Sequence, residues 1–426
     1  METIQLEMME DHHFIGAHQA NIAIKRNIYN EVDPSTSCNG GRVSLAATNK
    51  PLVSSWLPTL HSTLSSLLRS TGSYPAQIQD SHLAFVREGV IPHLKQPPTA
   101  VDRLHYILTH NHSPYEASVA FAPEKLPKVR FTVQPLVDLS PVDDPLGQKG
   151  LREKMEGLAA ACGADCTWLD AFVDCIFLTP EEEAGLVKKE HNGDSTSELP
   201  RQICYAGFDL ESDEDENGKA SIGMKAYLFP QLKALATGRD LVGITESVLA
   251  RLADGDKGML AAWELLKTFF SSHGEDNINI YFLAIDCLAT QSESNKAQPR
   301  FKIYAHTHAN SLALAREVLT LGGRLPPSSA EFLPTVWPFL MDMEDVPRAQ
   351  MESLEKPLNE PDSKYCGLCF AFELVPGKAV PQVKMYVPMW QYARDEAGTV
   401  ERYQRILQTQ GIMGDYKFVA GVQDAL

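Results

Sequence analysis

The chain repeats one pattern of local structure four times, with two helix-like runs followed by two strand-like runs in each repeat. The helical runs place apolar residues three and four positions apart, whereas the strand runs alternate between apolar and polar residues. Recurrence at this scale indicates one repeated architecture and not a series of independent domains. The eight predicted strands cover residues 115–122, 128–136, 202–210, 222–229, 277–287, 301–306, 365–375 and 382–388.

Short or polar connections join the two strands of each repeat, so neighbouring strands should be antiparallel. One face of these strands is apolar and packs on helices, and closing the sheet protects the polar face as a lumen. We therefore predict an α/β (α+β) fold with an antiparallel central β-barrel, a polar lumen and a ring of helices. Residues 46–426 should form this single domain after a poorly ordered segment, 1–45. Only helical sequence follows the fourth repeat, so the last strand pair is expected to be missing.

The polar strand faces combine cations with aromatic rings. Residues two apart on a strand point to the same face, and three strands carry a lysine followed at this spacing by a tyrosine: Lys225 and Tyr227, Lys302 and Tyr304, Lys384 and Tyr386. A fourth strand, 128–132, has the same alternation with Arg130 as its cation. If these strands share a sheet, the lumen suits a polyanion that departs from a reactive carbocation, as a prenyl diphosphate does.

The bulk composition limits the partners and the compartment. A net charge of −17 argues against a general nucleic-acid partner. No run of about 18 apolar residues predicts a membrane span, and residues 1–16 lack the apolar core of a secretory signal. Eight cysteines without a disulfide framework are typical of a reducing compartment. We expect a cytoplasmic protein whose partners are small molecules, without nucleic acid or membrane.

Two other features could hold a metal ion. The acidic run from Asp209 to Asn217 could bind Mg²⁺ for a diphosphate, although a charged loop in solvent is the simpler interpretation because the run lies on a hairpin. Two His-x-His pairs have no carboxylate or cysteine at regular metal spacing and are interpreted as loop and strand-end residues: His110 with His112, and His306 with His308. No metal site is predicted.

Prenyl transfer to an electron-rich ring needs a neutralised diphosphate, a shielded allylic cation and an activated nucleophile. Lysine and arginine neutralise phosphate oxygens, tyrosine faces attract the cation and exclude water, and a lumen carboxylate can accept an indole N–H. The candidates for diphosphate binding are Arg130, Lys225, Arg300, Lys302 and Lys384, and those for the cation shield are Tyr227, Tyr304 and Tyr386. Glu116, at a strand start with Ser118 on its face, is the candidate catalytic carboxylate.

At these residues the chain resembles the fungal dimethylallyltryptophan synthase family of aromatic prenyltransferases, from about Trp56 to Tyr392. The resemblance implies the ααββ (PT) barrel, and transfer of a dimethylallyl group from dimethylallyl diphosphate to the indole ring of tryptophan or of a tryptophan-containing cyclic dipeptide, in fungal indole alkaloid biosynthesis. It assigns to Glu116 and to the cations and tyrosines above the roles just described. No cofactor is required, although Mg²⁺ or Ca²⁺ can stimulate; a homodimer is one expectation for assembly. The markers are 114–118, 128–132, 224–230, 300–304 and 383–388.

The chain departs from the family pattern in three places. Glu211 stands near the position where tryptophan C4 enzymes carry a lysine that takes the ring proton, which makes it a candidate proton acceptor. Some members have glutamine where Lys384 stands. The family also has a fifth strand pair after the last helices. Two alternatives stay open: a catalytically impaired or non-catalytic barrel that binds an aromatic or isoprenoid ligand, and a metal-dependent prenyl-chain enzyme that uses the acidic run.

Overall fold

The structure is a computed structural model. It describes residues 4–10, 18–24, 56–95, 105–109, 112–122, 125–140, 142–191, 201–214, 220–273, 278–288, 298–361, 367–412 and 420–421.

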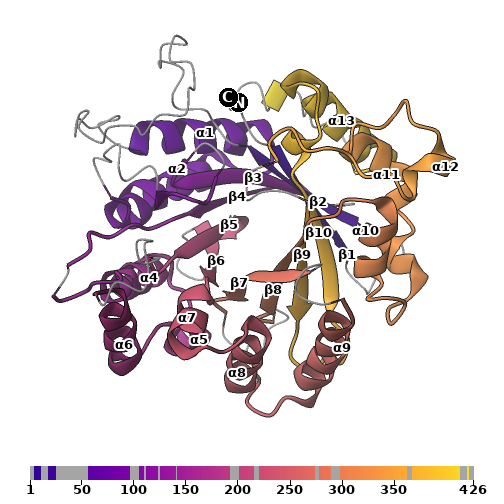
Figure 1. The fold of residues 1–426 in the computed structure, drawn as a ribbon. Coiled ribbons are helices and arrows are strands. Elements are labelled where there is room, and N and C mark those ends of the chain that lie inside the picture. The colour runs from indigo at the N-terminus through magenta and orange to yellow at the C-terminus, as the bar shows by residue number, and fades with distance from the viewer. Residues whose placement is uncertain are drawn as a thin grey trace, which may run out of the picture.

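Ten antiparallel strands of the described residues close into a barrel (Figure 1), in the spatial order β1-β10-β9-β8-β7-β6-β5-β4-β3-β2. All four predicted hairpins are present, and each pairs with the next in sequence, so the predicted antiparallel barrel is confirmed. The strands are β1 (Ile4–Glu10), β2 (His18–Ile24), β3 (Tyr115–Phe121), β4 (Lys128–Val133), β5 (Cys204–Glu214), β6 (Ala220–Leu228), β7 (Asn279–Asp286), β8 (Phe301–Thr307), β9 (Leu368–Leu374) and β10 (Gln382–Val387).

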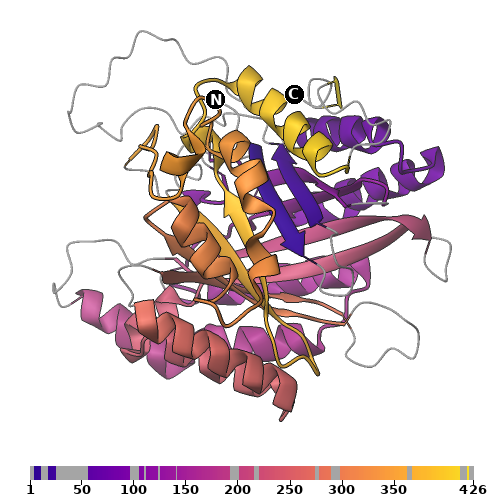
Figure 2. The same cartoon turned by 90° about the vertical axis from the view of Figure 1, so that its right-hand side faces the viewer.

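The two N-terminal strands correct the expectation of an incomplete barrel. The backbone of β1 pairs with β10 through Leu6 and Val387, and β2 pairs with β3 through Ile22 and Val119. Figure 2 shows this indigo hairpin beside the yellow strand β10. The four repeats alone would leave a curled eight-stranded sheet with two open edges, which are exposed to pairing with other chains. Residues 4–10 and 18–24, which the sequence analysis set apart from the barrel, therefore form the strands that close it.

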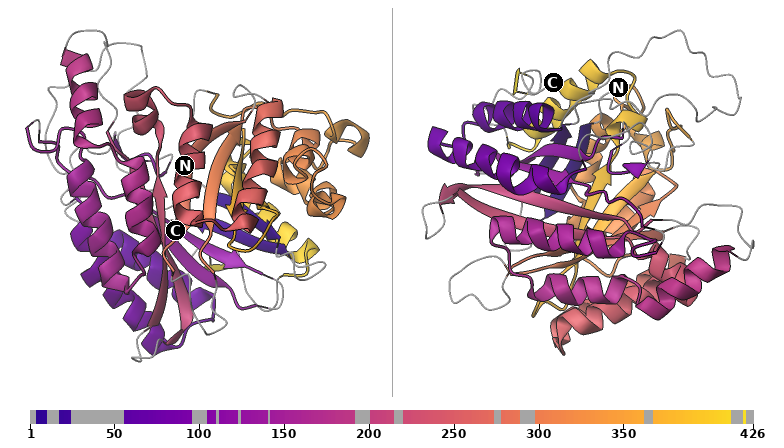
Figure 3. Two further views of the ribbon diagram at one scale, coloured as in Figure 1. Left: turned by 90° about the horizontal axis from the view of Figure 1, so that it is seen from below. Right: turned by 90° about the vertical axis from the view of Figure 1, so that its left-hand side faces the viewer.

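Helices surround the barrel on its outside (Figures 1 and 3). The α-helices are α1 (Leu57–Ser70), α2 (Ala76–Phe85), α4 (Gln148–Cys162), α5 (Thr167–Ile176), α6 (Pro180–His191), α7 (Gln231–Thr237), α8 (Leu241–Ala253), α9 (Lys257–His273), α10 (Leu312–Leu319), α11 (Leu333–Leu340), α12 (Arg348–Met351) and α13 (Glu396–Thr409). A π-helical turn, Val86–Val90, extends α2, and short 3₁₀ turns lie at Ile91–His93, Pro327–Ala330 and Met389–Gln391.

Local capping explains why residues 231–253 form two helices and not one. Gly238 ends α7 with a positive φ of 70°, a conformation that glycine adopts without steric cost. The side chain of Asp240 then accepts a hydrogen bond from the backbone N–H of Gly243 and begins α8. The break lets the helical layer follow the curvature of the barrel.

The main core lies between the outer faces of the strands and the helices. The apolar residues that alternate with the lumen cations are buried there, as predicted; on β4, for example, Val129, Phe131 and Val133 are at most 1% exposed. Burying an aliphatic or aromatic side chain of this size stabilises the fold by about 1.5–3 kcal/mol. Each strand thus packs one face on the helices and leaves the other to the lumen. Within the described parts of the chain, no helix has the length and apolar character needed to cross a membrane.

Candidate active site

The lumen holds a large cavity that encloses about 1310 Å³ of empty space, its open mouth included. Every residue named by the sequence analysis for the catalytic, diphosphate-binding and shielding positions lines this one cavity: Glu116, Arg130, Lys225, Arg300, Lys302, Lys384, Tyr227, Tyr304 and Tyr386. They come from five strands and one strand-flanking residue, so barrel closure is what brings them together. The side chain of Glu211 does not line the cavity.

Three buried carboxylates hold the lumen cations in place, and the first is Asp209 on β5. Its Oδ1 lies 2.5 Å from the Nζ of Lys225 and 3.1 Å from the Nε of Arg130. Burial alone would raise the pKa of the Asp209 carboxyl, but the charges of Arg130 and Lys225 hold it well below its usual range. Burial lowers the pKa of Lys225 to about 8, against the attraction of Asp209.

The other two carboxylates, Asp286 and Glu373, share Arg300. Asp286 lies 2.6 Å from the Nζ of Lys302 and 2.6 Å from the Nε of Arg300. Glu373 lies 3.0 Å from Nη1 of Arg300 and accepts a hydrogen bond from Lys384. Burial alone would raise the pKa of both carboxyls, but these cations hold that of Asp286 well below its usual range and that of Glu373 at about 2.

Within the described residues, these three carboxylates pair with the five cations, and two of the carboxylates share Arg300. A buried cation without a counterion is costly, so the carboxylates make the cation cluster stable in the free protein. Cations gathered in this way favour an anion that enters the cavity. A diphosphate can bind here either by sharing the cations with these carboxylates or by displacing the carboxylates from them.

An aromatic wall lies beside the cations, and Phe282 joins the three predicted tyrosines in it. The rings of Phe282 and Tyr304 stack with centroids 4.3 Å apart, and Tyr227 contacts both. Tyr386 continues the wall, with its ring centroid 5.7 Å from that of Tyr304. In the described structure the three tyrosines thus gather on one side of the lumen. Ring faces in such a position attract a carbocation and exclude water.

A β-bulge adds rings that simple alternation does not predict. The register between β7 and β8 shifts between Ile280 and Phe282, and a bulge turns two successive side chains to one face. Tyr281 and Phe282 consequently both line the cavity. With Tyr205 and Phe229 they form a mutually contacting aromatic cluster at one end of the lumen. A flat, apolar ring system fits between such faces.

Glu116 lies on a cross-strand row that leads to the cation cluster. In the register of neighbouring strands, Glu116 pairs with Thr132, Thr132 with Gly207, and Gly207 with Lys225. Gly207 leaves room at the centre of this row, because a Cβ there would lie 3.1 Å from the Cε2 of Tyr227. The opening lies between a carboxylate and a cation, where a planar acceptor can approach a bound donor.

A loop next to β3 closes one end of the cavity with Ile107 and Leu108. The backbone N–H groups of both residues donate to Oε1 of Gln134, at 2.7 and 3.0 Å. The same amide donates to the carbonyl of His105. Gln134 is buried, so this side chain fixes the loop as part of the cavity wall.

The start of the acidic run differs from the solvent-exposed loop that the sequence analysis favoured. Asp209 is inside the cavity, and Glu211 is tied to Lys128 at 2.6 Å. Residues 212–214, which continue β5, are exposed as expected for a charged run in solvent. The described residues contain no group of three histidine, cysteine or acidic side chains that could hold a metal ion. Residues 215–217 of the run lie outside the described residues.

His306 lies at the end of β8, in agreement with its interpretation as a strand-end residue, and its side chain also lines the cavity. Burial lowers the pKa of its imidazole to about 4, and His308 adds to the effect. His110, which the sequence analysis considered with it, lies outside the described residues. Sequence reasoning missed the carboxylates Asp286 and Glu373 as well, although each is an acidic residue in an otherwise apolar strand, which is a usable signal.

Comparisons with known proteins identify the family. The family described as tryptophan dimethylallyltransferase matches residues 53–418. The indole prenyltransferase tdiB of Emericella nidulans is 30% identical over 386 residues, which cover 85% of this chain and 86% of tdiB. The indole diterpene prenyltransferase terF of Tolypocladium album is 28% identical and covers 84% of this chain and 81% of terF.

Solved structures show the same fold. NotF in complex with brevianamide F and DMSPP superposes with a TM-score of 0.64 at 20% sequence identity, covering 85% of this chain and 83% of NotF. At that identity the structural similarity supports the barrel architecture alone. Membership of the family rests on the family match and on tdiB. The chain therefore belongs to the tryptophan dimethylallyltransferase family and is a prenyltransferase.

Proposed function

We propose that this enzyme transfers a dimethylallyl group from dimethylallyl diphosphate to the indole ring of tryptophan or of a tryptophan-containing cyclic dipeptide, in fungal indole alkaloid biosynthesis. The observation that carries the proposal is one cavity in which five cations, an aromatic wall and Glu116 converge. NotF, a structural neighbour, has been solved with brevianamide F and DMSPP, which supports a small aromatic acceptor beside a prenyl donor.

The cation cluster would bind the diphosphate of the donor. Arg300 can grip phosphate oxygens as a fork, while Lys225, Lys302 and Lys384 act as point charges. These side chains already converge on the lumen in the free protein, so donor binding exchanges their carboxylate partners and does not have to bring the cations together. As the carbon–oxygen bond of the donor breaks, the negative charge grows on the oxygens that the cluster contacts.

The aromatic wall would stabilise the allylic cation left behind. Tyr227, Tyr304 and Tyr386 offer ring faces, each worth up to ~2 kcal/mol when desolvated. Phe282 completes the surface through its stack with Tyr304. The wall also keeps water from the cation, which would otherwise yield the free alcohol.

Glu116 would hold the acceptor by accepting a hydrogen bond from the indole N–H. The bond orients the ring across the row that ends at Lys225, and it raises electron density on the ring. The ring attacks the allylic cation, a carbon–carbon bond forms, and loss of a ring proton restores aromaticity. Positioning of this kind converts a bimolecular reaction into one within a complex.

No cofactor is required in this scheme, because protein cations neutralise the diphosphate directly. Mg²⁺ or Ca²⁺ could stimulate by shielding the same charge. Transfer in the presence of a chelator tests the point: activity that persists supports metal-independent catalysis, and activity that disappears supports a metal-dependent prenyl-chain enzyme using the acidic run.

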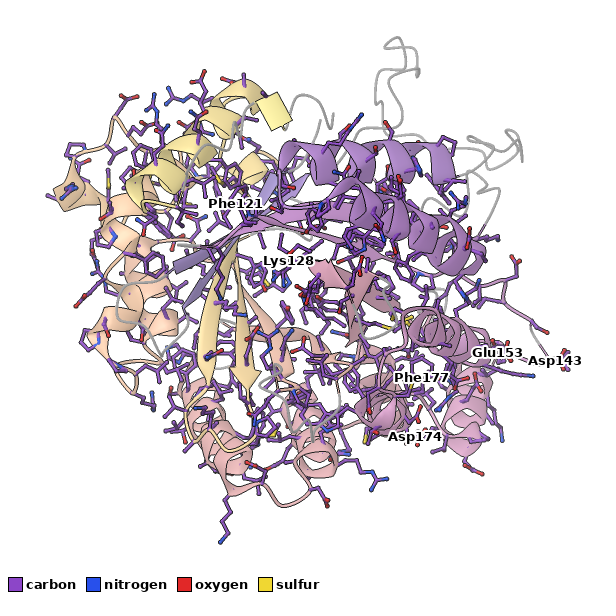
Figure 4. All side chains as sticks on the ribbon, turned by 180° about the vertical axis from the view of Figure 1, so that it is seen from behind. Phe121, Lys128, Asp143, Glu153, Asp174 and Phe177 are labelled. Carbon is purple, nitrogen blue, oxygen red and sulfur yellow. The ribbon has the colours of Figure 1, made fainter. Side chains whose placement is uncertain are left out.

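The test of the proposal is a product assay by mass spectrometry. The purified chain is incubated with dimethylallyl diphosphate, a chelator, and a panel of tryptophan and tryptophan-containing cyclic dipeptides. We expect a prenylated acceptor from the wild type, and loss of most transfer in Glu116→Ala with unfolding unchanged. Glu153→Gln, on the exposed face of α4 and labelled in Figure 4, is the control. Wild-type turnover in Glu116→Ala would contradict the role of Glu116.

A catalytically impaired barrel that only binds an aromatic or isoprenoid ligand is the alternative. Its main support was the missing strand pair, and the pairing of β1 with β10 and of β2 with β3 removes that support. Binding of donor and acceptor without any product in the same assay would favour it.

We further infer a cytoplasmic location and leave a homodimer as the assembly to test. No disulfide joins any two of the six cysteines in the described residues, which fits a reducing compartment. Light scattering of the purified chain would distinguish a dimer from a monomer, and localisation of a tagged chain would check the compartment.

A further inference from the structure

The last step of the proposed reaction needs a base in the lumen, and the obvious candidates are occupied. Asp209, Asp286 and Glu373 each contact two cations. A carboxylate held in this way is a weak proton acceptor, and all three lie where the diphosphate would bind. Glu116 would be engaged with the indole N–H. Glu211, tied to Lys128, does not line the cavity.

His306 is the imidazole that lines the same cavity in the described structure. Its ring packs edge-to-face on Tyr281, with centroids 4.6 Å apart and an interplanar angle of 83°. Its Nε2 is buried and has no hydrogen-bond partner among the described residues. Leaving a buried polar atom unsatisfied costs about 1–3 kcal/mol, so this nitrogen is an acceptor or donor held ready for something that enters the cavity.

The barrel places His306 opposite Glu116. In the closed order of strands, β8 stands five positions from β3 in either direction, so the two side chains line opposite walls. The aromatic cluster that contains Tyr281 lies on the side of His306. A ring whose N–H faces Glu116 would therefore extend its far edge toward His306.

We propose that Nε2 of His306 accepts the proton that the indole ring loses after prenylation. The inference rests on the proposed function. The allylic carbon–oxygen bond breaks with both electrons on the diphosphate, and a ring carbon bonds to the allylic carbon. The carbon–hydrogen bond at that ring carbon then breaks, its electron pair returns to the ring, and the proton forms a bond to Nε2. The products are the prenylated acceptor, diphosphate and an imidazolium, which passes its proton to solvent or to the departing diphosphate.

The surroundings suit this role. Burial keeps the imidazole neutral at physiological pH, so the nitrogen carries a lone pair in the tautomer with hydrogen on Nδ1. The titratable groups around it are Tyr281, whose pKa burial raises to about 12, together with His308 and, on the adjacent strand, Cys369. A weak base suffices, because a protonated aromatic ring is a strong acid. The diphosphate held by the cation cluster offsets the charge of the imidazolium.

The experiment compares His306→Asn with the matched control His308→Asn, two residues along the strand end and exposed. Acceptors with a fully deuterated indole ring are used beside unlabelled ones. In the wild type we expect no primary isotope effect on kcat, because ionisation and attack limit the rate. In His306→Asn we expect kcat to fall about 10²-fold, the range of general base catalysis, with the donor KM unchanged and a primary isotope effect emerging. His308→Asn should match the wild type.

A primary isotope effect in the variant would show that loss of the ring proton limits its rate. A merely structural role of His306 would lower the rate without this isotope effect. If His306→Asn does not fold, His306→Gln provides the same test. If the wild type forms product, and His306→Asn forms it at the same rate without an isotope effect, the role of His306 is overturned. The proposed function would still stand. Wild-type product that retains every ring deuterium would overturn the role of His306 too. No product from the wild type with any acceptor would instead refute the proposed function.

Discussion

Replacing Asp286 by asparagine removes the charge at the centre of the cation cluster while keeping the shape of the side chain. Asp286 is 2% exposed and contacts Lys302 and Arg300 at 2.6 Å each. Asparagine keeps one carbonyl oxygen, which can accept from one of these donors. Arg300 keeps its ion pair with Glu373 at 3.0 Å. Lys302, which is buried, therefore loses more of its electrostatic stabilisation than Arg300 does.

The expected effects are opposite for the free and the ligand-bound protein. Removing one partner of a buried ion pair costs about 3–5 kcal/mol, and because Arg300 keeps a partner we expect about 3 kcal/mol less stability. Binding of inorganic diphosphate should tighten at the same time, since it no longer competes with Asp286. Two unit charges 4 Å apart interact by about 4 kcal/mol at an effective dielectric of 20. Even a third of this tightens binding roughly tenfold.

Urea unfolding with and without inorganic diphosphate measures both effects. A ligand at 100 times its Kd stabilises the folded state by about 2.7 kcal/mol, so diphosphate should restore much of the lost stability in Asp286→Asn. The control is Asp174→Asn, which breaks the pair with Arg152 at 2.7 Å on the outer helices. Figure 4 shows Asp174 there, away from the barrel strand that carries Lys128. This exposed pair should change stability by less than about 1 kcal/mol. Unchanged stability and unchanged diphosphate binding in Asp286→Asn would refute the counterion argument.

Three further predictions concern the donor, the acceptor and barrel closure. Donor binding should weaken as the pH rises through about 8, because the lowered pKa of Lys225 makes it lose its charge there; KM for the donor against pH measures this, and Lys225→Arg should move the loss to higher pH. Gly207→Ala should lower kcat/KM for the acceptor about tenfold, a loss of ~1.4 kcal/mol, because the new methyl meets Tyr227 at 3.1 Å. The control is Gly223→Ala, whose new methyl has its nearest contact at 3.6 Å and should leave kcat/KM unchanged. Deleting residues 1–24 should shift the products from prenylated acceptor to the hydrolysed donor, because water would reach the cation; equal product ratios would contradict closure by β1 and β2.

Much of the fold and of the site could be predicted from sequence because the same two-residue alternation along the strands determines both. Alternation of two residues along β4, β6, β8 and β10 assigns apolar side chains to the helices and cations with tyrosines to the lumen, and the structure agrees in each strand. Repetition of that pattern predicts that the strands are neighbours. The cation cluster and the tyrosine wall follow from these two facts.

The remaining parts depend on departures from that periodicity. The bulge at Ile280 brings Tyr281 and Phe282 into the lumen together. It could not be predicted from sequence, because no residue type here is specific for a bulge. The imidazole of His306 lies at the end of β8, where the sequence does not show whether the lumen continues. Positions 4, 6 and 8 alternate as apolar residues in β1, but the acidic and histidine-rich surroundings outweighed this short signal.

The hairpin of β1 and β2 sets the order in which the barrel can fold. Leu6 pairs with Val387, almost the full length of the described chain away, and contacts so distant in sequence form slowly, because loop closure must precede them. During synthesis β1 and β2 emerge before the other described strands, whereas β10, the partner of β1, emerges after all of them. The lumen therefore stays open until β10 has been made. Completion of the active site is a late folding event, and chaperones that shield the waiting strand edges would act before it.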